Sequence, residues 1–487
     1  MHQIFSHFSV FTLIHIVFVI GITWRVIMRR PPASVAFAWL FLVAIFPLGG
    51  ALIYLLIGEQ RIGRQRTTRI QQLREEFSKV SQHAISKGLV DVDWSRHSSE
   101  AFAINSIGRN IIGTNTLQGS RYQLFSDTQE ILQQITADVD RAQTSVLMEF
   151  YIWNEGGNAD KVLDAVIRAA ERGVSCRLLI DALGASAWWK GKQPQQLRDA
   201  GVELHRALPV GVFRTLIGRT DLRLHRKIVV IDGAVAWTGS MNLVDPRYFK
   251  QGAGVGEWVD AMARFEGAVV VSLAATMVSD WLLETGETLQ AIVKSAGLKF
   301  AEPDGTVDIQ VIPSGPGYSS DGLLQMVLAL IYAAKDELVL TTPYLAPDAS
   351  VTKALRGAAA RGVKVSLIVP EKVDSLLTRY ASRSYYDELF DTGVEIHLYK
   401  GGLLHTKSIT VDQSITMFGT VNLDMRSLWI NYEVSLFVYD EGFAKEIRQL
   451  QQSYLDDSLS LDIEAWKQRG FKQRFLENVF RLSSALL

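Results

Sequence analysis

Two long apolar stretches without charge open the chain. No Lys, Arg, Asp or Glu occurs in residues 1–24 or in residues 33–58. Each run is long enough to cross the roughly 30 Å hydrocarbon layer of a bilayer as a helix. The pattern predicts a two-helix transmembrane hairpin over residues 1–60, kinked at Pro47. The alternative for the first run is a signal peptide, but no small-residue cleavage site follows it and a second apolar run does.

Beyond a predicted polar linker at residues 61–118, the sequence repeats itself. RAAERGVSCRLLID (168–181) matches GAAARGVKVSLIVP (357–370), and AGVELH (200–205) matches TGVEIH (392–397). Apolar runs of strand length alternate with amphipathic helical patterns in the same order in both copies. The repeat therefore predicts two similar α/β lobes, each a mixed β-sheet covered by helices.

We expect the lobes to occupy residues 119–295 and 305–487 and to pack as a pseudo-dimer around one shared site. Two copies of this size are too few and too large for a solenoid. The second lobe ends in a tail, residues 466–487, with a basic start and an apolar finish at helical spacing. Such a tail either lies in a membrane interface or docks as a helix.

Composition narrows the class of partner. Fifty basic residues against fifty-one acidic ones give a net charge of −1, so the chain has no overall basic footprint for nucleic acid. Cys176 is the only cysteine, which excludes an intrachain disulfide and disfavours a zinc site. We therefore predict no nucleic-acid partner and no metal.

Two copies of one short phrase carry the candidate chemistry: LRLHRKIVVID (222–232) and LLHTKSITVD (403–412). Their shared residues are His225, Lys227 and Asp232, then His405, Lys407 and Asp412. Residues two apart in a strand share a face, so each histidine is expected to point with its lysine. Each aspartate falls at a turn, where it is expected to hold backbone or a neighbouring lysine.

A glycine-led phrase follows each copy, GSMN (239–242) and GTVN (419–422). It offers hydroxyl and amide donors for a substrate from Ser240, Asn242, Thr420 and Asn422. Two imidazoles, two ammonium groups and these donors around one space would form a phosphate site that needs no metal or cofactor. One histidine could attack phosphorus while the other exchanges protons.

A reactive imidazole also needs its second ring nitrogen held, normally by a carboxylate. Glu433 follows His405 by 28 residues and Asp260 follows His225 by 35, both in apolar strand-like runs. The unequal spacing leaves Glu257 as a substitute for Asp260. The alternative, two basic strands that face solvent, is disfavoured because both copies keep the same register.

The doubled H-x-K-x₄-D phrase resembles the signature of the phospholipase D superfamily. Within it the chain is most similar to the bacterial cardiolipin synthases, through the two apolar runs, DPRYFKQGAGVGEWVD (245–260), SGPG (314–317) and GTVNLDMRSLWIN (419–431). The resemblance implies that two phosphatidylglycerol molecules react through a phosphatidyl-histidine, giving cardiolipin and glycerol. It also implies His225 as the nucleophile, His405 as acid and base, and a bacterial inner membrane location with the lobes in the cytoplasm.

Three matters stay open at this point. The arginines after each apolar run only lean towards a cytoplasmic body, and the oligomeric state is not indicated. A membrane-anchored phospholipase D-type hydrolase or a silent lipid-binding scaffold would share many of these features. AWWKGK (187–192) either lies against anionic lipid head groups or belongs to the core, and the basic stretch 214–227 either attracts such lipid or is a solvated face.

Overall fold

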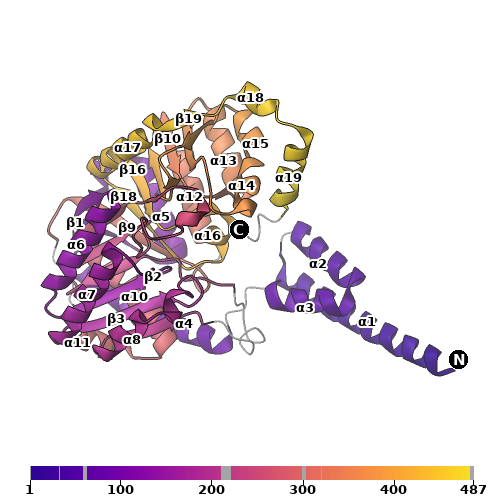
Figure 1. Cartoon of the computed structure of the whole chain (residues 1–487), viewed down its shortest axis with the longest axis horizontal. Coiled ribbons are helices and arrows are strands. Elements are labelled where there is room, and N and C mark those ends of the chain that lie inside the picture. Colours follow the sequence, from indigo (N-terminus) through magenta and orange to yellow (C-terminus); the bar gives the residue numbers. More distant parts are fainter. Residues whose placement is uncertain are drawn as a thin grey trace. The chain divides into compact units, whose positions relative to one another are not determined.

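The fold is taken from a computed structural model. It describes residues 2–31, 33–58, 63–209, 221–298, 303–319 and 321–482. The chain forms two compact units, one made of the described residues of Met1–Thr67 and Val210–Asp221 and one made of those of Thr68–Pro209 and Leu222–Leu487 (Figure 1).

The first unit is a group of three helices: α1 (His2–Arg29), α2 (Ala33–Ile45) and α3 (Pro47–Ile57). Among the described residues only α1 is long and apolar enough to cross a membrane, through Thr12–Arg29. The expected hairpin of two crossings is not confirmed, because the second apolar run is divided at Phe46. The residue before a proline is pushed out of the helical region, and Phe46 has φ −122° and ψ 78°.

One continuous sheet of 15 strands forms the second unit. The strands of the first lobe, in spatial order, are β1 (Thr116–Phe125), β8 (Met262–Gly267), β6 (Val235–Gly239), β5 (Ile228–Ile231), β2 (Ser145–Phe150), β3 (Ser175–Asp181) and β4 (Glu203–Ala207). Strands β2, β3 and β4 are parallel to one another, and the other pairs are antiparallel. The sheet is therefore mixed, as predicted.

The second lobe repeats this strand order in the other half of the same sheet. Its strands are β9 (Val307–Ser314), β18 (Glu433–Tyr439), β16 (Ile415–Gly419), β15 (Ser408–Val411), β10 (Glu337–Thr341), β12 (Lys364–Pro370) and β13 (Glu395–Tyr399), with β19 (Ser458–Ser460) at the edge. Strands β1 and β9 pair antiparallel, with Leu117 opposite Ile309. The two lobes thus lie side by side as two repeats of one topology, magenta and orange to yellow in Figure 1.

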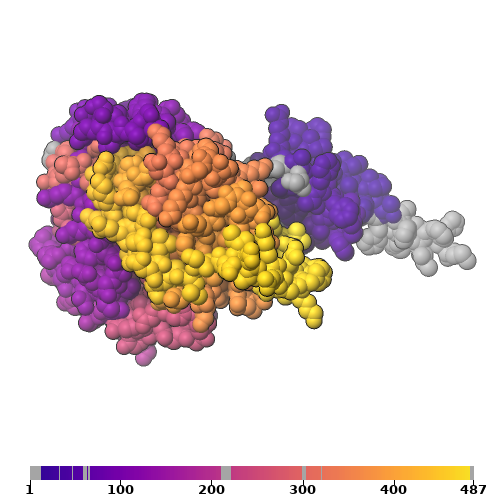
Figure 2. Space-filling view, turned by 90° about the horizontal axis from the view of Figure 1, so that it is seen from above, coloured from indigo at the N-terminus to yellow at the C-terminus, as the bar shows by residue number. Residues whose placement is uncertain are grey.

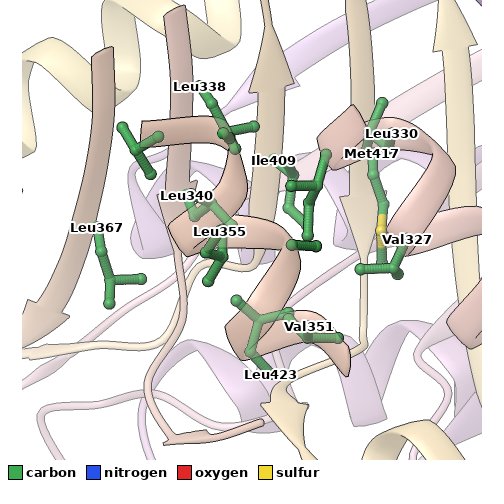
Figure 3. Close-up of a cluster of buried hydrophobic side chains, with 14 of the residues drawn as sticks. Val327, Leu330, Leu338, Leu340, Val351, Leu355, Leu367, Ile409, Met417 and Leu423 are labelled. Carbon is green, nitrogen blue, oxygen red and sulfur yellow. The ribbon is translucent and has the colours of Figure 1, made fainter. Parts of the chain in front are cut away.

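Helices cover both faces of the sheet. They are α6 (Thr128–Arg141), α7 (Asn158–Glu171), α8 (Gln193–Asp199), α10 (Val269–Thr285) and α11 (Leu289–Ser295) in the first lobe, and α12 (Gly322–Ala333), α13 (Ala349–Ala360), α14 (Leu376–Arg383), α15 (Tyr386–Phe390) and α17 (Glu441–Asp456) in the second. Alternate residues of β2 enter different cores: Met148 packs with α6 and α7, whereas Leu147 packs with α10. Figure 3 shows the equivalent core of the second lobe, where α12 and α13 cover β10 and β15.

The expected linker, residues 61–118, is largely folded. It contains α4 (Arg64–Ser86), α5 (Ser99–Ile107), the π-helical turn Gly108–Ile112 and the start of β1. Leu73 of α4 is buried with α10, and Ile104 of α5 is buried with α12. These residues belong to the lobes rather than to a free connection.

The last helices among the described residues are α18 (Ile463–Lys467) and α19 (Phe471–Arg481), which lie on the second lobe (Figure 2). Phe480 stacks on Tyr380 with ring centroids 5.3 Å apart, and Glu477 pairs with Arg383. Phe471, on the opposite side of the helix, is 81% exposed. The tail therefore docks as a helix and keeps an apolar face outside.

Candidate active site

Two short contacts between the lobes position the histidines. A bridge joins Leu224 of the first lobe to Tyr432 of the second, directly before His225 and Glu433. Its counterpart is the parallel pair of β7 (Trp258–Val259) and β14 (Leu403–Leu404), directly before Asp260 and His405. In each contact the histidine and the acid directly follow the paired residues. Each histidine therefore lies beside an acid of the other lobe.

The first half-site pairs His225 with Glu433. The Nδ1 atom of His225 lies 2.8 Å from Oε2 of Glu433, and both side chains are buried. The Thr420 hydroxyl donates to the same carboxylate oxygen at 2.6 Å, and the Asn431 amide donates to the other at 3.2 Å. A carboxylate on Nδ1 fixes the tautomer that carries its hydrogen there, which leaves the Nε2 lone pair for chemistry.

The second half-site repeats this arrangement with the lobes exchanged. The Nδ1 atom of His405 lies 2.7 Å from Oδ1 of Asp260, and the Ser240 hydroxyl donates to the same oxygen at 2.5 Å. The sequence suggested the opposite pairing, Glu433 with His405 and Asp260 with His225, and that interpretation is wrong. It placed each acid with the histidine of its own repeat, whereas the bridges between the lobes exchange them. Glu257 is exposed and does not take this role.

The lysines lie on the histidine side of their strands, as the alternation of side chains predicts. Lys227 Nζ donates to the His225 carbonyl at 2.6 Å, and Lys407 Nζ donates to the His405 carbonyl. Arg226, between His225 and Lys227 in sequence, points to the other face and pairs with Asp280. Both ammonium groups are therefore buried beside the imidazoles.

The G-[ST]-x-N residues divide into two kinds of contact. The hydroxyls of Ser240 and Thr420 give their single hydrogen to Asp260 and Glu433, so they position the carboxylates instead of offering a donor to substrate. Asn242 accepts from the Ile152 backbone N–H at 3.2 Å through its oxygen, which leaves its NH₂ group as a donor. The Asn242 amide is therefore the better candidate for substrate contact, whereas the Asn422 side chain already hydrogen-bonds to Asp424.

Asp232 and Asp412 hold backbone, as their turn positions suggested. Asp232 accepts from the N–H groups of Gln143, Thr144 and Ser145 at the start of β2. Asp412 accepts from the N–H groups of Lys335, Asp336 and Glu337 at the start of β10. Each aspartate follows its own strand, β5 or β15, at the end remote from the histidine, and fixes the turn that leads into the neighbouring strand, β2 or β10.

Burial sets the protonation of the reactive groups. It lowers the pKa of both His225 and His405 to about 4, against the attraction of the carboxylates. Burial also lowers the pKa of Lys227 to about 8 and that of Lys407 to about 7. Each lysine acts electrostatically on the histidine of the other lobe, so the four groups share one site.

Sequence reasoning missed the groups around this set. Tyr151 lies edge-on to the His225 ring at 5.0 Å, and the Trp258 ring lies 4.4 Å from that of His405. Beneath the first half-site, burial raises the pKa of Glu149 well above its ordinary value, with Asp280 and Arg226 beside it. An acid in the apolar run VLMEFY was the available signal for Glu149.

Comparison with known proteins decides the family. A family model described as "Cardiolipin synthase, PLD-like domain" matches residues 135–251 and 327–454, once in each lobe. The chain is 41% identical over 473 residues to "Cardiolipin synthase A" of Erwinia tasmaniensis, with 96% of each chain covered. The chain belongs to the cardiolipin synthase family. It is accordingly a phosphatidyltransferase of the phospholipase D superfamily.

Further matches agree with this membership. "Cardiolipin synthase A" of Yersinia pseudotuberculosis is also 41% identical over 473 residues, with 96% of each chain covered. A model described as "Phospholipase_D-nuclease N-terminal" matches residues 8–59. The crystal structure of phosphatidylserine synthase of Haemophilus influenzae Rd KW20 matches with a TM-score of 0.59 at 16% identity, over 80% of this chain and 100% of that one. This last likeness shows the fold of the two lobes.

The sequence offered two segments, AWWKGK and the basic stretch 214–227, as possible contacts with lipid. In AWWKGK, Trp188 and Trp189 are buried, and Trp188 stacks on Trp153 with centroids 5.0 Å apart. The core interpretation of this segment is therefore confirmed. Of the basic stretch 214–227, residues 214–220 lie outside the described residues.

Proposed function

We propose that this protein transfers a phosphatidyl group from one phosphatidylglycerol to another through a covalent phosphatidyl-histidine. The observation that supports it is the crossed arrangement of His225 on Glu433 and His405 on Asp260. Each imidazole keeps Nδ1 on its carboxylate, so both Nε2 atoms are available to one phosphodiester. Such a pair suits a double displacement with one nucleophile and one proton carrier.

In the first step, Nε2 of His225 attacks the phosphorus of one phosphatidylglycerol. A nitrogen–phosphorus bond forms as the bond to the head-group glycerol oxygen breaks, and protonated His405 gives its proton to that oxygen. Glycerol leaves. Lys227, Lys407 and the amides of Asn242 and Asn422 stabilise the phosphoryl oxygens as charge develops on them.

In the second step, a head-group hydroxyl of another phosphatidylglycerol attacks the phosphatidyl-histidine. Neutral His405 takes the hydroxyl proton as the new phosphorus–oxygen bond forms and the bond to His225 breaks. The products are cardiolipin and the free enzyme, with His405 protonated again. The cycle conserves protons and needs no added cofactor.

Protonation of His405 at neutral pH depends on the substrate. With a pKa of about 4 in the unliganded enzyme, the imidazole is neutral at pH 7. An anionic phosphodiester beside it favours the imidazolium by Coulomb attraction and raises this pKa. Substrate binding therefore supplies the charge that the first step uses.

We propose further that the first unit anchors the enzyme in the bacterial inner membrane, with the lobes on the cytoplasmic side. The apolar helix α1, which has no charged residue before Arg25, supports a membrane anchor. A second crossing by residues 33–58, as predicted from the sequence, is one form of this anchor, and a single crossing is the other. Anchoring beside the bilayer raises the local concentration of lipid hydroxyl groups at the active site. This favours transfer to a second lipid over hydrolysis by water. The net charge of −1 speaks against nucleic acid as the phosphodiester.

The test is to incubate the detergent-solubilised full chain with phosphatidylglycerol alone and to identify the products. Transfer gives cardiolipin and glycerol. Phosphatidic acid and glycerol as the only products would replace the transferase by a membrane-anchored hydrolase. Unchanged lipid would point to a scaffold, and both of these results overturn the proposal.

A further inference from the structure

The second apolar run of the sequence reverses direction in the middle. Phe46 is the only residue between α2 and α3. The rings of Trp39 and Tyr54 meet edge to face with centroids 5.3 Å apart, although they are 15 positions apart in sequence. In one continuous helix these residues would be separated by roughly 22 Å along the axis. Helices α2 and α3 therefore form an antiparallel helical hairpin.

Close packing at one glycine holds this hairpin together. A Cβ atom built on Gly50 would lie 2.7 Å from the carbonyl oxygen of Leu42, so the two backbones nearly touch there. The neighbouring Gly49 has no heavy atom within 4 Å of such a Cβ. Val43 of α2 and Ala51 of α3 are buried together with Val26 of α1. Small residues allow the close helix contacts that membrane helices depend on.

Neither arm of the hairpin can cross a bilayer by itself. Helix α2 has 13 residues and α3 has 11. At 1.5 Å per residue they are about 20 Å and 16 Å long, against about 30 Å of hydrocarbon. Yet the hairpin exposes large apolar side chains, with Phe37 and Phe41 about 70% exposed. The exposed surface of the hairpin fits acyl chains, and its length fits only part of the bilayer.

We infer that α1 is the single crossing of the membrane and that α2 and α3 form a re-entrant hairpin, inserted into one leaflet from the side of the lobes. The backbone tolerates this position because the turn keeps its own hydrogen bonds, from Phe46 N–H to Leu42 and from Gly50 N–H to Phe46. The inference rests on the proposed membrane attachment and is independent of the chemistry of the active site. It places the N-terminus opposite the lobes.

The basic residues favour this topology over two crossings. Arg25, Arg29 and Arg30 stand at the end of α1, and further arginines at 61, 64, 66 and 69 follow the hairpin. Two crossings would place these groups on opposite sides of the membrane. One crossing places all of them on the side of the lobes, while the N-terminal end before Arg25 has no Lys or Arg. The positive-inside rule then assigns that side to the cytoplasm without conflict.

The first test locates three positions of the full chain with a membrane-impermeant maleimide, in right-side-out and inverted vesicles. Cys176 is buried and is replaced by alanine. Single cysteines are then introduced as Gln3→Cys, Pro31→Cys and Lys192→Cys, the last on the exposed surface of the first lobe. We expect Pro31→Cys to react from the same side as Lys192→Cys, and Gln3→Cys from the opposite side. Two results would overturn the inference. One is reaction of Gln3→Cys from the side of Lys192→Cys with Pro31→Cys on the opposite side, and the other is reaction of all three from one side.

The second test measures the hairpin in the membrane. A short bifunctional maleimide should join the two cysteines of the Trp39→Cys/Tyr54→Cys variant, and no cross-link would mean a continuous helix. Gly50→Leu should lower the yield of cross-link at least about fivefold, whereas the matched change Gly49→Leu should leave it unchanged. Equal yields in both leucine variants would contradict the packing argument. Neither readout requires activity, so an inactive protein with this topology would count against the proposed function only.

Discussion

At the scale of single residues, the carboxylates Glu433 and Asp260 decide which nitrogen of each histidine can react. Replacing either acid by its amide keeps the shape but allows an N–H to face Nδ1. The imidazole would then carry its hydrogen on Nε2 and lose the lone pair that attacks phosphorus.

We therefore expect Glu433→Gln to lower kcat by about 10³-fold or more, with little change in the melting temperature. Asp260→Asn should have an effect of similar size. The matched control is Glu257→Gln, three residues before Asp260 and exposed, which should stay within about twofold of the parent. Steady-state assays with phosphatidylglycerol would measure this, and a Glu433→Gln enzyme that retains a tenth of the activity would contradict the orienting role.

The lowered pKa of the histidines predicts a proton taken up on substrate binding. The pKa of His405 is about 4 in the free enzyme and is raised when an anionic phosphodiester binds. Between these two pKa values the bound state holds one proton more, so affinity falls as pH rises, by up to about tenfold per unit.

Titration calorimetry with a non-hydrolysable phosphonate analogue would detect this uptake, in buffers of different ionisation enthalpy. At about pH 5.5 both lysines are already charged, because their pKa values are about 7 and 8, and the proton is then assigned to a histidine. His405→Gln should reduce the uptake. Proton release, or affinity independent of pH between 5 and 6, would be the contrary result.

At the scale of elements, the short pair β7 and β14 brings His405 to Asp260, and it requires close approach of two loops. Gly256 has φ +79°, and a Cβ atom built there would lie 2.9 Å from the Cα of Gly402. Gly393 has a similar φ of +91° but no heavy atom within 4 Å of such a Cβ. The two glycines thus share a left-handed backbone conformation, which glycine adopts without strain, and differ in the contact.

Gly256→Ala and Gly393→Ala should therefore both lose about 1–2 kcal/mol of stability, since alanine is strained in this conformation. Only Gly256→Ala should also displace β14 and lower kcat, by about tenfold or more, because a misplacement near 1 Å has this order of effect. Urea denaturation and activity assays on both variants separate the two effects. Equal activities would show that the contact between Gly256 and Gly402 does not position the site.

The pattern of elements also shows how far sequence reasoning reaches. Alternation along KIVVI and KSITV was enough to predict that His225 points with Lys227 and that Asp232 serves a turn, since these properties are local. The pairing of His225 with Glu433 depends on a bridge between residues about 200 positions apart, for which the local pattern has no signal. The reversal at Phe46 was missed for a related reason: the run 33–58 is apolar throughout, so its periodicity is the same for one helix or two.

At the scale of the whole molecule, the two lobes repeat one topology but differ beneath their reactive strands. Under His225 lie the ionisable groups of Glu149, Arg226 and Asp280. Under His405 the corresponding contacts are neutral, with Thr406 on Tyr454 and Thr341 on Ser408. The duplication therefore supplies two histidines in equivalent frames whose surroundings are free to diverge, and a double displacement requires them to act differently.

This difference in role can be tested with a substrate whose leaving group needs no proton, such as phosphatidyl-4-nitrophenol. If His225 is the nucleophile and His405 the proton carrier, His405→Ala should still release one nitrophenolate per enzyme in a burst and then stop, because the incoming alcohol finds no base. His225→Ala should give no burst, because no covalent bond to phosphorus can form. Rapid mixing with absorbance detection measures the burst, and mass spectrometry of the stalled His405→Ala enzyme should locate the phosphatidyl group on residue 225. A burst in His225→Ala and none in His405→Ala would exchange the two roles while leaving the shared site between the lobes intact.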